Sequence, residues 1–251
     1  MRSLAEMEAV RRLLADGVPA RSIAAETRVP LRTVVRWGQG RTRAFGNRPR
    51  PRPWRPPDDW SYSYLLGLYL GDGHVYVTKR GACLLRVHLD AAYPGIVNEC
   101  RLAMEMTTLG GRTHVLLRRG SRVNTVQSSW KRWPEALPQH GPGPKHLRPI
   151  MLTDWQRETV AARPRQFVRG LIHSDGCRTV NRFKTRLPSG RVAEYAYPRY
   201  FFSNLSADIR ALFCEACEAI GVRWTLSNPR NVSVADRRSV AILEDVVGPK
   251  S

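Results

Sequence analysis

The sequence contains one nine-residue pattern twice. Residues 65–73 read Leu-Leu-Gly-Leu-Tyr-Leu-Gly-Asp-Gly, and residues 168–176 read Val-Arg-Gly-Leu-Ile-His-Ser-Asp-Gly. Both segments are largely apolar, carry small residues four positions apart and end in Asp-Gly, with the two aspartates 103 positions apart. Self-similarity at this distance indicates two related half-domains, so the fold must be one that is built twice from the same elements.

Each copy of the pattern predicts a helix that packs closely against the other copy. Gly67 and Gly71 are four residues apart and share one helix face, as do Gly170 and Ser174. Small residues in such a stripe let two helix backbones approach each other. Helix start signals precede both copies, at Asp58, Asp59 and Pro164.

The ends of the two helices carry the residues that point to chemistry. Side-by-side packing brings Asp72 and Asp175 together, each at the negative end of a helix dipole. That arrangement is unfavourable unless a divalent cation binds between the carboxylates, and Mg²⁺ prefers sites of one or two carboxylates completed by water and phosphate oxygens. Gly73 and Gly176 follow the acids, and we expect both to take the left-handed conformation that ends many helices.

These two motifs resemble those of the LAGLIDADG homing endonucleases, in the single-chain form with two motif copies. The resemblance implies an α+β fold with two pseudo-symmetric αββαββα half-domains around a central helix pair. It also implies that Asp72 and Asp175 are catalytic acids that bind Mg²⁺ or Mn²⁺. The sequence departs from the family motif at its sixth position, where Leu70 and His173 replace an acid. A simpler interpretation is that both segments are packed helices with capping aspartates.

Alternation and turn signals fill both intervals with the elements that this fold requires. The first half, residues 58–150 with its connector, is predicted to contain strands at 75–78 and 83–89, a helix from Asp90 to about 106, and strands at 113–117 and 122–127. The second half, residues 151–251, is predicted to contain two strands around a turn at 188–190, a helix at 206–220, two further strands and a helix at 238–246.

The first strand of the second half carries basic residues at alternate positions, so their side chains share one face. These residues are Arg178, Arg182, Lys184 and Arg186. We expect them to contact DNA phosphates, although a solvated sheet face shows the same pattern.

Residues 130–150 connect the halves in a Gly- and Pro-rich stretch. In the family, basic residues near the acids stabilise the charge that develops on phosphate. The resemblance therefore suggests Lys131 and Lys145 as catalytic residues, with His146 as a further candidate. For His140, a structural turn is the preferred interpretation.

Residues 1–37 predict three short helices, at 4–15, 21–27 and 31–37. The stretch from 17 to 34 resembles bacterial resolvase-type and sigma-type helix-turn-helix segments, which implies that Arg32, Thr33 and Arg36 face outward on a recognition helix and contact DNA. Arg28 departs from the motif, which usually has Gly there because a left-handed backbone costs a side chain about 1 kcal/mol. A three-helix cap with no DNA-binding role is the alternative.

Residues 38–57 combine many Arg and Pro residues and contain no acid, which predicts an extended basic linker. Arg50 and Arg52 fit a role in a DNA minor groove, as basic arms have, while a solvated spacer explains the composition equally well.

The charge of the chain favours a nucleic-acid partner. Lys and Arg number 41 against 21 acids, a net charge of +20, and such an excess destabilises a compact fold unless a polyanion offsets it. Only five of the basic residues are Lys; the Arg fork suits phosphates and guanine edges, although GC-rich coding DNA also favours Arg. A ribosomal or membrane-surface role is a weaker alternative.

The composition predicts a soluble cytoplasmic protein associated with the bacterial nucleoid. No apolar run approaches the roughly 20 residues of a membrane helix, and the first residues lack the plan of a secretory signal. The five cysteines form an odd, scattered set, which indicates reduced thiols. Cys214 and Cys217 have metal-ligand spacing, but apolar neighbours make buried thiols the preferred interpretation over zinc.

Together these features predict a monomeric, metal-dependent endonuclease that hydrolyses phosphodiester bonds of double-stranded DNA. The alternative is a helix-turn-helix and LAGLIDADG-like transcription regulator that does not cleave. A third possibility is a transposase-like nuclease that uses Asp72 and Asp175 with Glu215 or Glu218, and whose first acid would lie on a strand.

Overall fold

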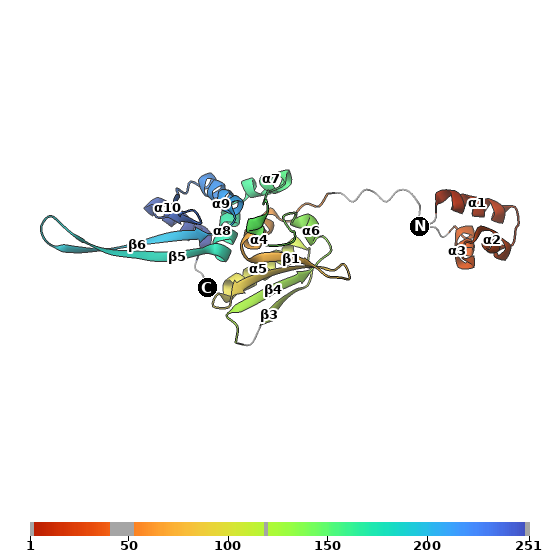
Figure 1. Ribbon diagram of the computed structural model, residues 1–251, viewed down its shortest axis with the longest axis horizontal. Coiled ribbons are helices and arrows are strands. Elements are labelled where there is room, and N and C mark those ends of the chain that lie inside the picture. Colours follow the sequence, from red (N-terminus) through yellow and green to blue (C-terminus); the bar gives the residue numbers. More distant parts are fainter. Residues whose placement is uncertain (1–2, 41–52, 118–119, 249–251) are drawn as a thin grey trace. The chain divides into compact units, whose positions relative to one another are not determined.

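The computed structural model describes residues 3–40, 53–117 and 120–248, and the chain divides into two compact units, residues 1–53 and 54–251 (Figure 1). Arg50 and Arg52 of the linker, for which DNA contacts are predicted, lie outside the described residues. Among the helices that are described, none is both long and apolar enough to cross a membrane.

The first unit is built from three helices: α1 (Leu4–Ala15), α2 (Ala20–Thr27) and α3 (Leu31–Gly38). A capping box starts α1, because the Ser3 hydroxyl accepts from the Glu6 amide and the Glu6 carboxylate accepts from the Ser3 amide. The apolar faces meet in a small core of Met7, Val10, Ile23, Val29, Val34 and Trp37.

The turn between α2 and α3 passes through one residue with a left-handed backbone. Arg28 ends α2 with φ 54° and ψ 25°, in the left-handed region. The motif normally has Gly at this point, so the sequence departs from the motif while the backbone does not. Burial of Ile23 and Val29 on either side of the turn offsets the strain.

The second unit contains two halves with the same order of elements. The first half comprises α4 (Asp59–Asp72), β1 (Gly73–Val77), β2 (Cys83–Asp90), α5 (Pro94–Thr107), β3 (Thr113–Leu117), β4 (Val123–Ser129) and the short α6 (Trp133–Ala136). The second half comprises α8 (Pro164–Asp175), β5 (Gly176–Arg186), β6 (Val192–Ser203), α9 (Ala207–Ala219), β7 (Thr225–Asn228), β8 (Asn231–Val234) and α10 (Arg237–Val247). A 3₁₀ turn (Lys145–Leu147) and α7 (Asp154–Ala162) lie between them.

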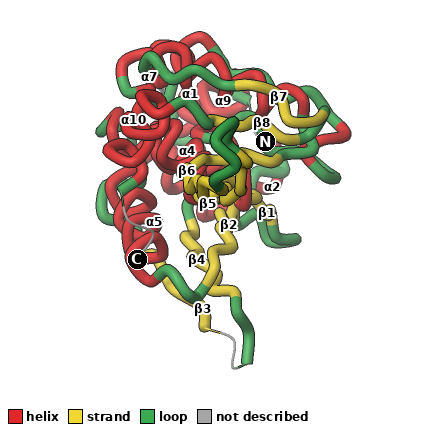
Figure 2. The backbone as a smooth tube through the Cα atoms, turned by 90° about the vertical axis from the view of Figure 1, so that its left-hand side faces the viewer, coloured by secondary structure: helices red, strands yellow, loops and turns green. Residues whose placement is uncertain are grey.

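The two antiparallel sheets have equivalent strand orders, β1-β2-β4-β3 and β5-β6-β8-β7. This topology confirms the predicted pair of αββαββα half-domains. The helices of each half pack on one face of its sheet, with α5 beside β4 and α10 beside β6 (Figure 2). In the second half, β5 and β6 continue as a long two-stranded arm past the helices (Figure 1).

The two motif helices, α4 and α8, pack against each other at the centre of this unit. A Cβ atom on Gly67 would lie 2.5 Å from the carbonyl oxygen of Phe167, and one on Gly71 would lie 2.1 Å from the Ser174 hydroxyl. The helices therefore approach each other so closely that Gly67, Gly71 and Gly170 leave no room for side chains. Ser174 completes the stripe and donates to carbonyls of its own helix.

Gly73 and Gly176 correct one expectation. Neither is left-handed: both are extended, with φ of −98° and −102°. Glycine is needed there because a Cβ atom would meet the preceding helical turn, 2.6 Å from Cα of Tyr69 and 2.7 Å from Cα of Ile172 respectively. Each helix can therefore pass directly into a strand right after its aspartate.

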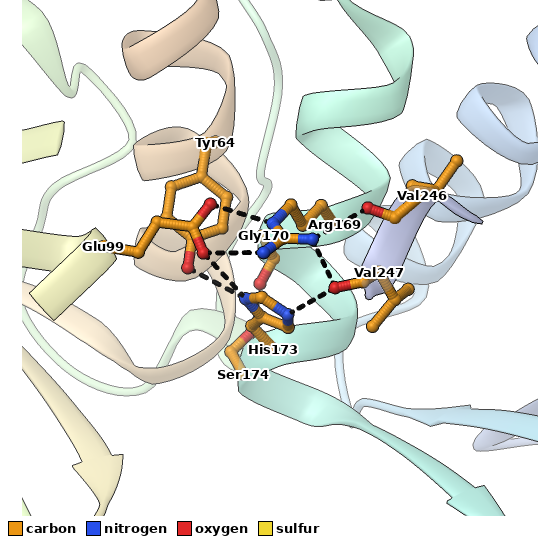
Figure 3. Close-up of polar contacts among 8 residues, drawn as sticks. All are labelled: Tyr64, Glu99, Arg169, Gly170, His173, Ser174, Val246 and Val247. Atoms are coloured by element: carbon orange, nitrogen blue, oxygen red, sulfur yellow. Dashed lines mark hydrogen bonds and ion pairs between the residues drawn. The ribbon is translucent and has the colours of Figure 1, made fainter. Parts of the chain in front are cut away.

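A polar cluster with a half-buried ion pair and a buried histidine joins the two halves beside the helix pair (Figure 3). Arg169 of α8 forms a bidentate ion pair with Glu99 of α5, at 2.8 and 2.9 Å, and also donates to the last carbonyls of α10. His173, which replaces the acid of the family motif, lies 2.9 Å from the Tyr64 hydroxyl through Nδ1 and 3.2 Å from the Val247 carbonyl oxygen through Nε2. At the sixth position of the second motif, His173 therefore forms structural hydrogen bonds between α8, α4 and the end of α10.

The start of α5 is a second correction. Asp90 was expected to cap this helix, but it is the last residue of β2 and its carboxylate accepts from the Ala92 amide in a turn. The helix begins at Pro94, whose fixed φ suits a first helical residue.

Candidate metal and nucleic-acid site

The C-termini of the two central helices open on one pocket, with a volume of about 420 Å³. Its walls come from the last turn of α4 and the start of β1, from Asp175 at the end of α8, from the connector at residues 140–148, and from the turn at 203–205. Asp72 is half-buried between two of the lining residues, Gly71 and Gly73. Asp175 lines the pocket and Asp72 does not, but both aspartates lie close enough to Lys145 for their charges to act on its pKa.

Lys145 reaches this site from the connector. Its ammonium group donates to the carbonyl oxygens of Tyr69, of Leu70 at 2.9 Å and of Gly71 at 3.0 Å. A cation at these carbonyls offsets the negative end of the α4 dipole. Burial lowers the pKa of Lys145 to about 8, while the charges of Asp175 and Asp72 oppose that shift.

The engagement of Lys145 limits what this residue does. An ammonium group has three donors, and three backbone carbonyls accept from it. Lys145 therefore has no donor left for a phosphate oxygen in this arrangement. Its role is to place a positive charge near Asp72 and Asp175 and to hold the last turn of α4.

Asp175 is held by a residue that the sequence did not single out. The side-chain amide of Asn204 donates to Oδ2 of Asp175 at a distance of 2.5 Å. Burial raises the pKa of Asp175, and the Asn204 hydrogen bond and the charge of Lys145 only partly counter this rise. A carboxylate in that state is poorly compensated by the protein alone, and a bound cation would stabilise its ionised form.

A buried hydrogen-bond network fixes the connector that carries Lys145. The Gln139 amide donates to Gln156 at 2.6 Å, the Gln156 amide donates to the Tyr62 hydroxyl at 2.7 Å, and Tyr62 donates to the Ala136 carbonyl at 2.6 Å. Tyr62 belongs to α4, so the connector is tied to the helix whose end it covers. Arg148 donates to the Gln139 carbonyl at 2.5 Å and completes this arrangement.

The donor set fits a cation that takes few protein ligands. Within the described residues, no three His, Cys, Asp or Glu side chains are grouped so as to hold a metal ion. Two carboxylates beside an open pocket match the preference of Mg²⁺ or Mn²⁺ for carboxylates completed by water and phosphate, and they do not match the closed four-ligand sites of structural zinc. Cys214 and Cys217 are buried in α9, as predicted, and burial raises the pKa of both thiols.

The other basic candidates of the connector are separated by the fold. His146 and His140 line the pocket, and His140 also lies in a turn whose amide donates to the Leu137 carbonyl. Lys131 is exposed, lies between β4 and α6, and is not among the residues that line the pocket. Arg148, which the sequence argument passed over, lines the pocket, and its Nε is buried with no partner among the described residues.

The predicted basic stripe of β5 shares one face, but the base of that face is covered. Arg178 pairs with Tyr200 of β6, and Tyr200 is buried against the helices. Arg178 also forms a 2.7 Å ion pair with Glu244 of α10. Farther along the arm, where no helix covers the strands, Lys184 pairs with Glu194 while Arg182 and Arg186 are exposed.

The opposite, open face of the arm carries aromatic side chains that the sequence pattern does not predict as a surface feature. Phe183, Tyr195 and Tyr197 stack in a ladder with ring centroids 5.4 to 5.9 Å apart. Phe183 and Tyr197 are each 44% exposed. Nearer the pocket on the same face, Arg199 donates to Ser233 at 2.7 Å. Alternation alone did not show which of the two faces the helices cover.

The open face of the first sheet carries a different set of polar side chains. Arg86 donates to Gln127 at 2.6 Å, and the rings of His74 and His88 stack 5.3 Å apart. Burial, followed by neighbouring positive charges, lowers the pKa of both histidines. The open faces of the two sheets therefore carry different polar and aromatic side chains.

In the first unit, α3 presents the predicted contact residues only in part. Arg32 and Arg36 are exposed, while Thr33 is half-buried. The alternative acids Glu215 and Glu218 are exposed on α9 and do not line the pocket. Since Asp72 also ends a helix and does not lie on a strand, the geometry disfavours the transposase-like arrangement.

Comparisons with known proteins give the following matches. No protein-family model matches the chain, and no curated protein matches it significantly. Similar solved structures include I-DmoI in complex with DNA and Mn (13% identity, TM-score 0.48, 76% of this chain and 98% of that chain). They also include the LAGLIDADG meganuclease I-AabMI bound to uncleaved DNA (12%, 0.44, 75% and 82%) and the LAGLIDADG homing endonuclease I-LtrWI bound to target DNA (10%, 0.46, 76% and 83%).

The fold itself follows from this chain's own topology. Two αββαββα halves around a helix pair, each helix ending in Asp-Gly, are the arrangement that the resemblance of its motifs to the LAGLIDADG homing endonucleases implies.

Proposed function

We propose that this protein is a divalent-metal-dependent endonuclease that hydrolyses phosphodiester bonds of double-stranded DNA. The observation that carries the proposal is the meeting of Asp72 and Asp175 at the ends of two tightly packed helices, beside an open pocket. Asp175 is half-buried at the negative end of a helix dipole and its pKa is raised, and carboxylates with perturbed pKa values of this kind cluster at functional sites.

In this proposal Asp72 and Asp175 hold Mg²⁺ or Mn²⁺. When bound, such a cation polarises the phosphate and makes a bound water more acidic. Asn204 orients the Asp175 carboxylate, and Lys145 keeps the end of α4 and its charge in place. His146 and Arg148 are among the residues that line the pocket, and in this proposal they supply positive charge or hydrogen bonds to the phosphate.

DNA binding is assigned to the open faces of the two sheets, to the arm, and to the first unit with its basic linker. The two sheet faces and the arm contact the two half-sites, which differ because the two faces differ. The three-helix unit and the basic linker add contacts through Arg32, Arg36, Arg50 and Arg52. A net charge of +20 supplies the long-range attraction to the phosphate backbone.

A single chain supplies both acids, so we propose that the protein acts on DNA as a monomer. We further propose that it acts in the bacterial cytoplasm, at the nucleoid. Light scattering of the protein bound to one DNA duplex would test this, with a mass for one chain per duplex expected. Two chains per duplex would contradict it.

The function is tested by selecting bound sequences from a random pool of double-stranded DNA and then incubating the selected DNA with the protein and Mg²⁺ or Mn²⁺. We expect nicked and fully cut products with either ion and none with EDTA. Tight binding of a selected sequence without cleavage in both ions would contradict the nuclease and identify a transcription regulator with the same fold.

A further inference from the structure

We propose that the arm formed by β5 and β6 lengthens the DNA target on the side of the second half, and that its open face recognises a guanine followed, away from the pocket, by A·T base pairs. The inference rests on the proposed function, because it concerns the DNA that is bound there. It goes beyond that function by naming the residues that select base pairs and by making one half-site longer than the other.

The two halves differ in the length of their first strand pair. β1 has 5 residues and pairs with β2 along its whole length, whereas β5 has 11 residues and pairs with β6 along its whole length. β8 pairs with β6 only at residues 200–203. The pairs from Thr179–Arg199 outward to Arg186–Val192 therefore form a two-stranded ribbon beyond the rest of the sheet (Figure 1).

The dimensions of this ribbon suit the major groove of DNA. That groove is about 12 Å wide in B-DNA and admits a two-stranded β-ribbon, whose side chains then reach the edges of the base pairs. The seven residue steps from Thr179 to Arg186 span about 24 Å, which is the length of about seven base pairs. With a net charge of +20 on the chain, DNA is also the partner whose charge fits.

The two faces of the ribbon differ in charge. Outward from Arg199, the side chains of the open face are uncharged: Thr179, Asn181, Phe183, Thr185, Ala193, Tyr195 and Tyr197. Arg182, Lys184 and Arg186 lie on the other face of the edge strand β5. Since Lys and Arg supply most of the attraction to phosphates, the uncharged face is better suited to base edges.

The aromatic ladder gives this face its apolar surface. Phe183 lies opposite Tyr195 in the strand register, and Asn181 lies opposite Tyr197. The stacked rings stabilise the ribbon, yet Phe183 and Tyr197 each remain 44% exposed. The C5-methyl group of thymine is the apolar group that the major groove offers to such rings, and an Asn amide pairs with adenine. We therefore expect A·T pairs beneath the ladder.

Arg199 lies at the inner end of the ribbon and is held in place before DNA arrives. Its Nη2 donates to the Ser233 hydroxyl at 2.7 Å, and its guanidinium carbon lies 4.7 Å from the centroid of the Phe201 ring. Its Nε is buried with no partner among the described residues. The donors that remain are those of Nη1 and the second hydrogen of Nη2, and two such donors match the O6 and N7 acceptors of guanine.

The strand spacing determines the order of these contacts along the DNA. Arg199, Tyr197 and Tyr195 occupy alternate positions of β6, so successive contacts are about 7 Å, or about two base pairs, apart. The A·T preference is therefore expected about two to four base pairs farther from the centre of the target than the guanine. With its 5 residues, β1 is too short to reach this distance on the other side.

The test selects bound sequences from a random pool of double-stranded DNA in Ca²⁺, with the wild type and with the double variant Phe183→Thr/Tyr197→Thr. Threonine is used because it favours strands. For the wild type, we expect a sequence that is longer on one side, with the guanine and the outer A·T pairs on that side. The double variant is expected to lose the A·T preference, to retain the guanine, and to bind the wild-type sequence at least fivefold more weakly.

Arg199→Ala is a second variant that leaves the ladder and its cross-strand pairs in place. We expect it to lose the guanine preference and to retain the A·T pairs. Val180→Ala is the matched control, because Val180 is on the other face of β5 and is 38% exposed, and its base preferences should equal those of the wild type.

Three results would overturn the inference. One is an unchanged base preference in both the double variant and Arg199→Ala. Another is the same change in Val180→Ala. The third is a uniform loss of affinity in Arg199→Ala, with the salt slope lowered by about 0.9 and the base preferences intact, which would identify a phosphate contact.

The outcomes separate the two proposals. Cleavage of a selected sequence whose base preferences do not depend on Arg199, Phe183 or Tyr197 would overturn the inference and leave the nuclease standing. A sequence whose recognition depends on these residues, but which is not cut in Mg²⁺ or Mn²⁺, would contradict the nuclease and support the inference.

Discussion

Gly67 and Gly170 face each other where α4 and α8 cross: a Cβ atom on Gly170 would lie 3.1 Å from Cα of Gly67 and 2.2 Å from the carbonyl oxygen of Tyr64. This contact sets the distance between the two helices. Because each helix ends in an aspartate a few residues later, the same contact determines how closely Asp72 and Asp175 meet. The packing of the core and the geometry of the site are therefore one feature.

Gly67→Ala and Gly170→Ala are expected to destabilise the protein by about 2 kcal/mol each or more, because the added methyl group meets backbone atoms that cannot rotate away. Gly141→Ala is the control, since its Cβ would approach only the end of the Arg148 side chain at 3.4 Å. Urea unfolding measures the difference. Stability equal to that of the control would show that the helices are not held this closely.

The sequence predicted this part of the fold because glycine spacing and the repeat depend on local pattern alone. The element order between the motifs followed in the same way, from alternation and from turns such as Gly81 and Gly190, both of which have positive φ. The predicted left-handed conformation of Gly73 and Gly176 was wrong. Glycine is required both at a left-handed helix end and where a helix passes directly into a strand, so the residue type does not distinguish the two. Only coordinates distinguish a steric requirement from a conformational one.

Arg28→Gly is expected to stabilise the first unit by about 1 kcal/mol, since the side chain occupies a left-handed backbone position. Hydrogen exchange of the α1 to α3 amides in the full-length protein reports on this unit alone. Greater protection is expected throughout the three helices. Unchanged or faster exchange in Arg28→Gly would show that contacts of the Arg28 side chain stabilise the unit by more than the left-handed backbone destabilises it.

Asp175→Asn is expected to be more stable than the wild type at pH 7 with EDTA. The pKa of Asp175 is raised in the folded state, so the fold favours the protonated carboxyl group over the ionised one. The stability that the protonated group contributes is fully present below the usual pKa of 3.8, and it is lost as the pH rises through the raised pKa. The variant stays neutral and avoids the loss. The advantage of the variant should therefore shrink as the pH falls through the raised pKa of Asp175, and it should be gone below about 3.8.

Urea unfolding at several pH values measures this difference, and saturating Mg²⁺ provides the second arm. Mg²⁺ is expected to stabilise the wild type and not the variant, because a ligand that binds only the folded state adds to stability. An Asp175→Asn protein that is less stable than the wild type at pH 7 without metal would show that the carboxylate is a structural cap.

Replacing both Arg182 and Arg186 with Ala is expected to remove about two phosphate contacts. The slope of log Kd against log salt concentration should therefore fall by about 1.8. Arg178→Ala is the control from the same stripe, because Arg178 is engaged by Glu244. Fluorescence anisotropy from low to moderate salt gives both slopes. Equal slopes for the double variant and the wild type would remove the arm from the DNA interface.

The site could be predicted only as far as its residues lie in patterned segments. Asp72, Asp175 and Lys145 were identified from the motifs and the connector, and the fold brings them together. Asn204 and Arg148 carry no signal in one sequence, since each stands in an irregular segment and makes its contact with a residue outside any shared pattern, Asn204 with Asp175 and Arg148 with the Gln139 carbonyl. The covered face of β5 could not be distinguished from the open one, because alternation fixes the spacing of side chains and not which side the helices take.

The most direct measurement compares cleavage of one selected DNA duplex by the wild type, Asp72→Asn and Asp175→Asn in Mg²⁺, with binding measured in parallel in Ca²⁺. The proposed nuclease predicts that the wild type nicks and cuts the duplex, and that each variant loses at least a hundredfold in cleavage rate while its Kd for the duplex stays within about threefold. Cleavage by either variant at the wild-type rate would contradict the assignment of the two aspartates.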